Sequence, residues 1–217
     1  MKKIVVINAS PRKEWNTGSL VREAARGAEE SGAEVRIFDL YKSEKFTGCI
    51  SCFGCKLPEH LGVCIYKDGL APILEEIRNA DGLIIGTPNY LGDVSAAFRS
   101  LYERLIFQSL TYKIEPKSYN KHMIPVLFIM TSNCSEDFYS QIGYDKMLEN
   151  YQNSLNGMVG PTKIMICGDT LQVNDYGKYN WTMFDSEAKK VHHEKMFPTD
   201  MKKAFELGME MVREPWK

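Results

Sequence analysis

The chain has 217 residues, a length that suits one sizeable α/β core and is short for two. Its 27 lysines and arginines are balanced by 28 acidic residues, so we do not expect a nucleic-acid-binding protein with a strongly basic face. No apolar run reaches the length of a membrane span, and the apolar start is too short for a signal peptide. We therefore expect a single cytoplasmic domain over residues 1–217 that binds neither nucleic acid nor membrane.

Short apolar segments alternate with helical patterns along the chain. Residues 3–8 are β-branched and almost wholly apolar, as expected of a strand that is covered on both faces. Further strands are predicted at 34–40, 82–86, 123–130 and 162–167, and helices at about 17–31, 70–79, 94–108, 138–154 and 185–213. Five strands separated by helices predict a doubly wound parallel sheet in an α/β fold, with helices on both faces. The last helix, with Pro198 near its first turn, is expected to cover the sheet.

The loop after the first strand is rich in hydroxyl and amide side chains and leads straight into a helix. Ligands of such sheets bind beyond the carboxyl ends of the strands. These side chains, with the backbone N–H groups at the helix start, would seat a phosphate, and Arg12 could add positive charge at the rim. Asn16, Thr17 and Ser19 could equally be ordinary capping and turn residues. Neither the dinucleotide fingerprint nor the P-loop pattern is present.

The loop after the third strand, residues 87–93, combines a proline turn, an aromatic residue and a glycine. Such a segment suits a planar ring, because backbone groups can meet the ring's heteroatoms while Tyr90 or Leu91 covers one face. This arrangement fits a flavin. The alternative is an ordinary turn in which Tyr90 belongs to the core.

With residues 10–17, residues 87–92 and the pair Glu103-Arg104, the sequence resembles the NAD(P)H-dependent FMN reductases and their iron-sulfur flavoprotein relatives. The resemblance continues through the cysteine segment and the helix at residues 197–200. It implies a flavodoxin-like three-layer α/β/α fold, FMN as cofactor, and a homodimer or homotetramer. By this resemblance Ser10, Arg12, Asn16 and Thr17 surround the FMN phosphate, Pro88, Asn89, Tyr90, Leu91 and Gly92 border the isoalloxazine, and Thr131, Ser132 and Asn133 hold its other side.

Four of the six cysteines fall in an insertion at about 46–66. Cys49, Cys52, Cys55 and Cys64 form the pattern C-x2-C-x2-C-x8-C, whose last gap is longer than in iron-sulfur flavoproteins. Thiolates at this spacing could hold a [4Fe–4S] cluster. The segment could instead bind zinc or no metal. Because the insertion follows the second strand, we expect a cluster at the same sheet edge as the flavin, where single electrons could pass between them.

Several other residues are chemically capable. Cys167 ends a buried strand and is expected in the core, whereas Cys134 lies in the third flavin loop and is either a packing residue or a redox-active thiol. His192 and His193 are expected on a solvated helix surface. The aromatic loop at 172–184 could be a lid, a subunit contact or a cover over another protomer's flavin.

The first hypothesis is an FMN-dependent oxidoreductase of the iron-sulfur flavoprotein type, which passes electrons between a donor and an acceptor through FMN and the cluster. NAD(P)H, ferredoxin and quinone are the candidate redox partners. The second is a cluster-free NAD(P)H-dependent FMN or quinone reductase, and the third is a non-catalytic flavin- or metal-binding regulatory module. No catalytic side chain is expected, because the cofactors carry the chemistry.

Overall fold

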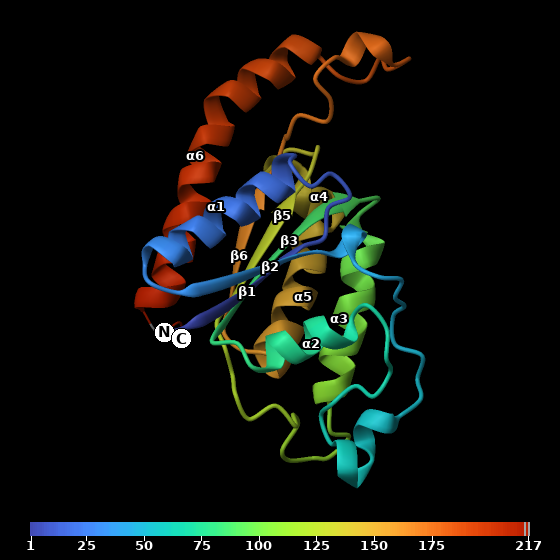
Figure 1. The fold of residues 1–217 in the computed structure, drawn as a ribbon. Helices are drawn as coiled ribbons and strands as arrows, with labels where there is room; N and C mark the ends of the chain where they lie inside the picture. Colours follow the sequence, from blue (N-terminus) through green and yellow to red (C-terminus); the bar gives the residue numbers. More distant parts are fainter. Residues whose placement is uncertain (215, 217) are drawn as a thin grey trace.

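The computed structural model describes residues 1–214 and 216 and shows a parallel sheet between two layers of helices (Figure 1). The strand order is β2-β1-β3-β5-β6, and all neighbours in this order are parallel. The predicted doubly wound α/β sheet is thereby confirmed. The strands are β1 (Lys3–Asn8), β2 (Glu34–Asp39), β3 (Gly82–Tyr90), β4 (Asp93–Val94), β5 (Val126–Thr131) and β6 (Thr162–Cys167).

Helices α1 and α6 cover one face of the sheet, and α2, α3 and α5 cover the other (Figure 1). The α-helices are α1 (Asn16–Glu30), α2 (Ala71–Arg78), α3 (Ala96–Ser109), α4 (Tyr139–Ile142), α5 (Tyr144–Met158) and α6 (Ser186–Arg213). The short 3-10 helices are η1 (Leu40–Lys42), η2 (Gly54–Lys56), η3 (Pro58–His60), η4 (Glu136–Phe138) and η5 (Tyr176–Lys178). Among the residues that the structure describes, no helix has both the length and the apolar character of a membrane span.

Three elements differ from the sequence prediction. Strand β3 continues to Tyr90, because its end pairs with β5 and then with the short antiparallel β4. The helix predicted at 138–154 is interrupted at Gly143, which has a φ of +78° and separates α4 from α5. Pro198 lies well inside α6 and not in its first turn. The helix begins at Ser186, within one residue of the predicted start, where the carboxylate of Asp185 caps it by accepting the N–H groups of Glu187 and Ala188.

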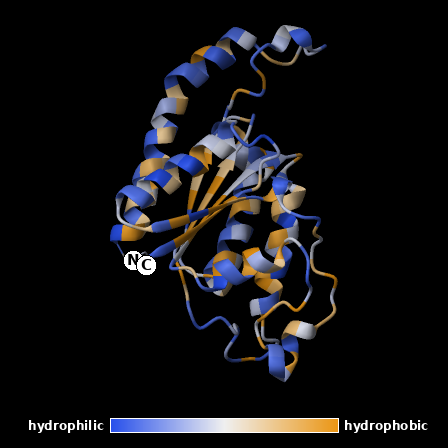
Figure 2. Ribbon diagram, in the orientation of Figure 1, coloured by the Kyte–Doolittle hydropathy of each residue, from blue (hydrophilic) through white to orange (hydrophobic). Residues whose placement is uncertain are grey.

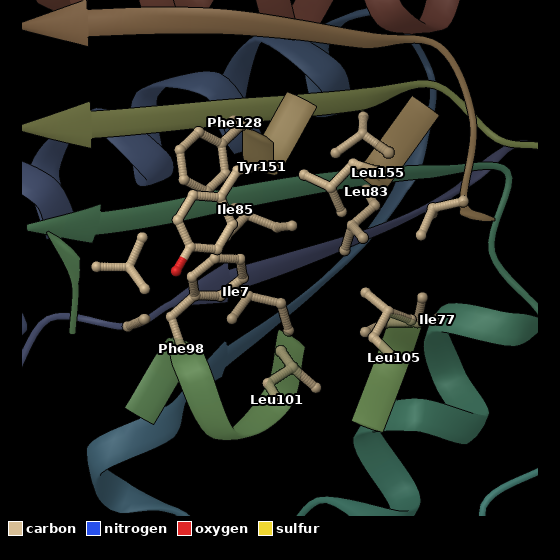
Figure 3. Packing of buried hydrophobic residues seen from close by; sticks show 14 of the residues in the cluster. Ile7, Ile77, Leu83, Ile85, Phe98, Leu101, Leu105, Phe128, Tyr151 and Leu155 are labelled. Atoms are coloured by element: carbon tan, nitrogen blue, oxygen red, sulfur yellow. The ribbon is translucent and has the colours of Figure 1, made fainter. Parts of the chain in front are cut away.

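Successive side chains of each strand point to opposite faces of the sheet, so each face has its own hydrophobic core. Figure 2 shows that the central strands are mostly hydrophobic while much of α6 is hydrophilic. On the face of α2, α3 and α5, the rings of Phe98, Phe128 and Tyr151 pack together, with the Phe128 and Tyr151 rings stacked at 6.0 Å (Figure 3). The Tyr151 hydroxyl donates a hydrogen bond of 2.7 Å to Asp93, which attaches the β3–β4 hairpin to α5.

On the opposite face, α1 and α6 touch through their backbones. A Cβ atom at Gly208 would lie 1.9 Å from the carbonyl oxygen of Ala24, and one at Gly27 would lie 2.0 Å from that of Phe205. Only glycine permits this approach at either position. The contact fixes α6 along α1, so the first half of α6 extends beyond the sheet together with the aromatic loop that precedes it (Figure 1).

Candidate functional site

A cleft opens at the carboxyl edge of the sheet, where the loops after β1, β3, β5 and β6 meet. We call it the strand-edge cleft. It is lined by Ser10, Arg12, Trp15, Asn16, Thr17, Pro88, Asn89, Tyr90, Thr131, Ser132, Asn133, Thr170, Leu171 and Gln172. Every residue predicted to surround FMN is in this lining except Leu91 and Gly92. Leu91 is fully exposed at the tip of the β3–β4 hairpin, and Gly92 faces Tyr144.

The start of α1 forms one end of the cleft. Asn16 and Thr17 are buried at the first turn, whose N–H groups have no acceptors within the helix. The preceding loop is fixed because the Ser10 hydroxyl accepts the N–H of Arg12 at 3.2 Å. A buried helix N-terminus beside an arginine suits an anionic group such as a phosphate.

The loop after β6 closes against this end of the cleft. The Leu171 carbonyl accepts hydrogen bonds from the Trp15 indole at 3.0 Å and the Asn16 amide at 2.8 Å. Arg12 donates to the Gln172 carbonyl at 2.5 Å and stacks over the Trp15 ring. Arg12 thus lines the cleft, and its guanidinium also joins the loop after β1 to the loop after β6.

The other end of the cleft lies between β3 and β5. The hydroxyls of Thr17 and Thr131 share a hydrogen bond of 2.7 Å, and Asn89 accepts the N–H of Gly92, which shapes the hairpin. Tyr90 is half-exposed and does not join the core. Burial raises the pKa of its hydroxyl, and Arg12 partly opposes that shift.

Two buried oxygen atoms in the lining lack hydrogen-bond partners among the described residues. They are Oδ1 of Asn133 and Oε1 of Gln172. A buried acceptor without a donor is costly, so these positions suit a ligand that brings N–H or O–H groups. A flavin ring and a ribityl chain both carry such donors, and the cleft residues fit FMN on this ground.

The four clustered cysteines line a second pocket with apolar walls. This cysteine pocket includes Cys49, Cys52, Cys55 and Cys64 together with Gly48, Ile50, Phe53, Ile65, Tyr66, Arg104, Phe107 and Gln108. The four cysteines of the sequence pattern thus line one pocket, and their thiols are donors of the type that iron-sulfur groups require. Their side chains are not arranged as a metal site, since no group of three His, Cys, Asp or Glu residues in the described parts of the chain is placed to hold a metal ion.

Helix α3 holds the cysteine segment in position. The N–H of Cys49 donates to Glu103 at 3.2 Å, and the N–H of Cys64 donates to Gln108 at 3.1 Å. Arg104 is buried and donates to the Asp68 carboxylate and the Tyr66 carbonyl. The Glu103-Arg104 pair singled out from the sequence therefore serves the cysteine segment.

The expected location of the cysteines at the flavin edge is wrong. The segment after β2 runs along the outside of α3 to the last turns of that helix, whereas the strand-edge cleft lies where α3 begins (Figure 1). The hydrogen bonds to Glu103 and Gln108 explain this course, because they attach the segment to the far half of α3. The two cavities share no lining residue.

Among the other singled-out residues, Cys167 is buried and donates to Asp200 at 3.0 Å. Burial is the main cause that raises the pKa of the Cys167 thiol, and the hydrogen bond with Asp200 raises it further. Cys134 packs against the core and is absent from the cleft lining. The predicted solvated surface for the histidines is only half correct, since His192 approaches Asp169 and His193 stacks on Phe197.

Sequence reasoning missed several contributors to the cleft. Thr170, Leu171 and Gln172 line it from the loop after β6, and their place at the carboxyl end of a strand was the available signal. Lys189 of α6 supports the cleft from outside by donating to the Asn133 carbonyl at 2.8 Å and pairing with Asp169. A lysine in a charged helical stretch carries no pattern that indicates this contact.

The sequence model of the NADPH-dependent FMN reductases matches residues 2–135, and the chain belongs to this family. It is 38% identical over 102 residues to an iron-sulfur flavoprotein of Methanocaldococcus jannaschii, an alignment that covers 47% of this chain and 51% of the relative. An iron-sulfur flavoprotein of Archaeoglobus fulgidus is 34% identical over 104 residues, covering 47% and 48% of the two chains. The chain spans about half the length of these relatives.

Solved structures show the same fold over the whole chain. The NAD(P)H:quinone oxidoreductase from Methanothermobacter marburgensis has a TM-score of 0.68 at 13% identity, covering 99% of this chain and 98% of the other. The FMN-dependent NADH-azoreductase from Bacillus anthracis, in complex with FMN, has a TM-score of 0.64 at 14% identity, covering 98% and 100%. These likenesses confirm the flavodoxin-like three-layer α/β/α fold.

Proposed function

We propose that the strand-edge cleft binds FMN and that the protein is an FMN-dependent oxidoreductase with NAD(P)H as donor. The observation that carries the proposal is the meeting of the α1 N-terminus, Arg12 and two unpartnered buried oxygens in one cleft at the carboxyl edge of the sheet. Family membership and the FMN complex of the Bacillus anthracis azoreductase support it.

In this proposal the residues divide by their place in the cleft. Ser10, Arg12, Asn16 and Thr17, with the first N–H groups of α1, hold the phosphate. Pro88, Asn89 and Tyr90 border the ring, with Leu91 and Gly92 at the hairpin beyond them, and Thr131, Ser132 and Asn133 lie on the other side. FMN supplies hydride and electron chemistry when bound. No side chain of the cleft needs to act as an acid or base.

We further propose that Cys49, Cys52, Cys55 and Cys64 hold a [4Fe–4S] cluster and that the protein transfers electrons as an iron-sulfur flavoprotein. The common pocket of the four cysteines supports this, as do the names of the relatives. A quinone or ferredoxin would then be the electron acceptor or donor. The single domain, the cytoplasmic location and the homodimer or homotetramer stay predictions.

The test is an absorbance spectrum of protein purified without oxygen, with FMN and iron quantified per chain. We expect one FMN per chain, iron in the proportion of a four-iron cluster, and bleaching of the flavin by NADPH under anaerobic conditions. Cys52→Ser should remove the iron and its broad brown absorbance, because it removes one of the four proposed ligands. Cys52 is exposed, so the substitution should disturb little packing. Cys134→Ser, outside the cysteine pocket, is the matched control and should keep the iron.

A yellow protein without iron would support a cluster-free FMN or quinone reductase. A flavin that NADPH leaves oxidised would support the non-catalytic module. A colourless protein that takes up no added FMN would end the proposal as a whole.

A further inference from the structure

A third cavity, of about 270 Å³, lies at the end of α3 that is remote from the strand-edge cleft. Three distant segments enclose it, namely residues 61–63 of the cysteine segment, residues 119–124 after α3, and residues 158–159 at the end of α5. The cysteine segment and the loop after α3 lie side by side here (Figure 1). We call this space the basic cavity.

The floor of the basic cavity is apolar and well buried. It is formed by Ile77, Leu105, Ile124 and Val159, each no more than 3% exposed. Gly62, with a φ of +76°, lets the cysteine segment approach Tyr119 so closely that a Cβ atom would lie 2.9 Å from the Tyr119 Cβ. An aromatic ligand would lie over this floor and bury the side chain of Leu61, which also lines the cavity and is 46% exposed.

The rim of the cavity is positively charged. The charges are those of Arg78 and Lys121, His122 lies beside them, and no acidic residue lines the cavity. Within residues 1–214 and 216, neither Arg78 nor Lys121 forms a salt bridge. His122 is held by a contact of 3.0 Å between Nε2 and the Ala80 carbonyl. Uncompensated cations beside a low-dielectric floor concentrate anions.

Gln108 connects this cavity with the cysteine pocket. It is only 5% exposed and lines both spaces, and its Oε1 accepts the N–H of Cys64. Its Nε2 group forms no hydrogen bond within residues 1–214 and 216 and is not among the fully buried polar atoms, so it remains accessible. A carboxylate or carbonyl oxygen in the cavity would complete the hydrogen bonding of this amide.

We propose that the basic cavity is a second ligand site that takes a small aromatic carboxylate of one or two rings. The ring would lie on the apolar floor, and the carboxylate would face Arg78 and Lys121. The volume lies just below the range of roughly 300–1,000 Å³ that is typical of ligand pockets, which suits a ligand of this size better than a dinucleotide. The site requires neither FMN nor a cysteine-bound group.

The probe is 2-naphthoate, titrated by calorimetry into the full chain with excess FMN, so that the strand-edge cleft is already filled. We expect one naphthoate per chain. The double variant Arg78→Gln with Lys121→Gln should weaken its affinity about tenfold or more, since both groups face the carboxylate. The control is Lys113→Gln with Lys146→Gln, two exposed lysines outside the cavity that change the net charge equally and should leave the affinity within about twofold.

The location is checked by nuclear magnetic resonance, where the Gln108 side-chain amide and the Val63 N–H should shift on addition of naphthoate. All four substituted cations are on the surface, so the variants should fold, and their melting temperatures verify this. Equal weakening by the two double variants would overturn the proposal, because it would show a dependence on net charge alone. Shifts confined to Asn133 and its neighbours, or no binding by either method, would overturn it as well.

Discussion

The guanidinium of Arg104 lies 2.5 Å from the carboxylate of Asp68, with the arginine side chain 1% exposed and the aspartate side chain 10% exposed. Asp68 also accepts the N–H groups of Thr47 and Leu70. The pair therefore joins α3 to both ends of the cysteine segment. Breaking it leaves a buried arginine without its counter-ion.

Asp68→Asn should accordingly destabilise the protein by about 3–5 kcal/mol in denaturant unfolding. The matched control is Glu30→Gln, which breaks the exposed pair of Arg26 and Glu30 on α1 and should cost no more than about 0.5 kcal/mol. Similar costs for the two variants would show that the Arg104–Asp68 pair does not hold the cysteine segment.

The same pair predicts a pH dependence. Burial acts to raise the pKa of Asp68, but the hydrogen bonds from Arg104, Thr47 and Leu70 outweigh it and lower the pKa. A carboxyl whose folded pKa is lowered stabilises the fold above its unfolded pKa, about 3.9, and loses that contribution as pH falls through the folded value. The stability difference between the natural protein and Asp68→Asn should be constant above about pH 5 and shrink below about pH 4. A difference that stays constant in acid would contradict the assigned role.

Gly208→Ala tests the backbone contact between α1 and α6. The new Cβ would lie 1.9 Å from the Ala24 carbonyl oxygen, so the helices must separate, at a cost of about 1–3 kcal/mol. Gly157→Ala in α5 is the control, because nothing lies within 4 Å of its Cβ position. That change should stabilise the protein by roughly 0.5–1 kcal/mol through helix propensity. Thermal melting of both variants measures the contrast, which disappears if α6 is only loosely attached.

Asn133→Ala tests the cleft. Removing the unpartnered Oδ1 should leave the melting temperature of the FMN-free protein unchanged or slightly higher, while FMN affinity falls about tenfold. Quenching of flavin fluorescence gives the dissociation constant. Asn150→Ala, on the exposed side of α5, should change neither quantity. A loss of stability without a loss of affinity would mean that Asn133 serves the fold and not the ligand.

The sheet was predictable because buried parallel strands leave continuous apolar runs, and β1 and β6 occupy the predicted residues. The loops after β1 and β3 could also be located from the sequence, because the order of strands and helices places them at the carboxyl ends of strands. The course of the cysteine segment was not predictable, because it depends on hydrogen bonds to Glu103 and Gln108 across more than forty positions. The place of Lys189 beneath Asn133 likewise exists only in three dimensions.

The hydrogen bonds from Arg12, Trp15 and Asn16 to the carbonyls of residues 171 and 172 have a consequence for dissecting the protein. The family match ends at residue 135, so those acceptors lie outside it. A fragment trimmed to the matched segment would lack β6 and one wall of the cleft, and it would leave three donors of the first loop without acceptors. The smallest unit that keeps the strand-edge cleft whole therefore includes β6 and the turn that follows it.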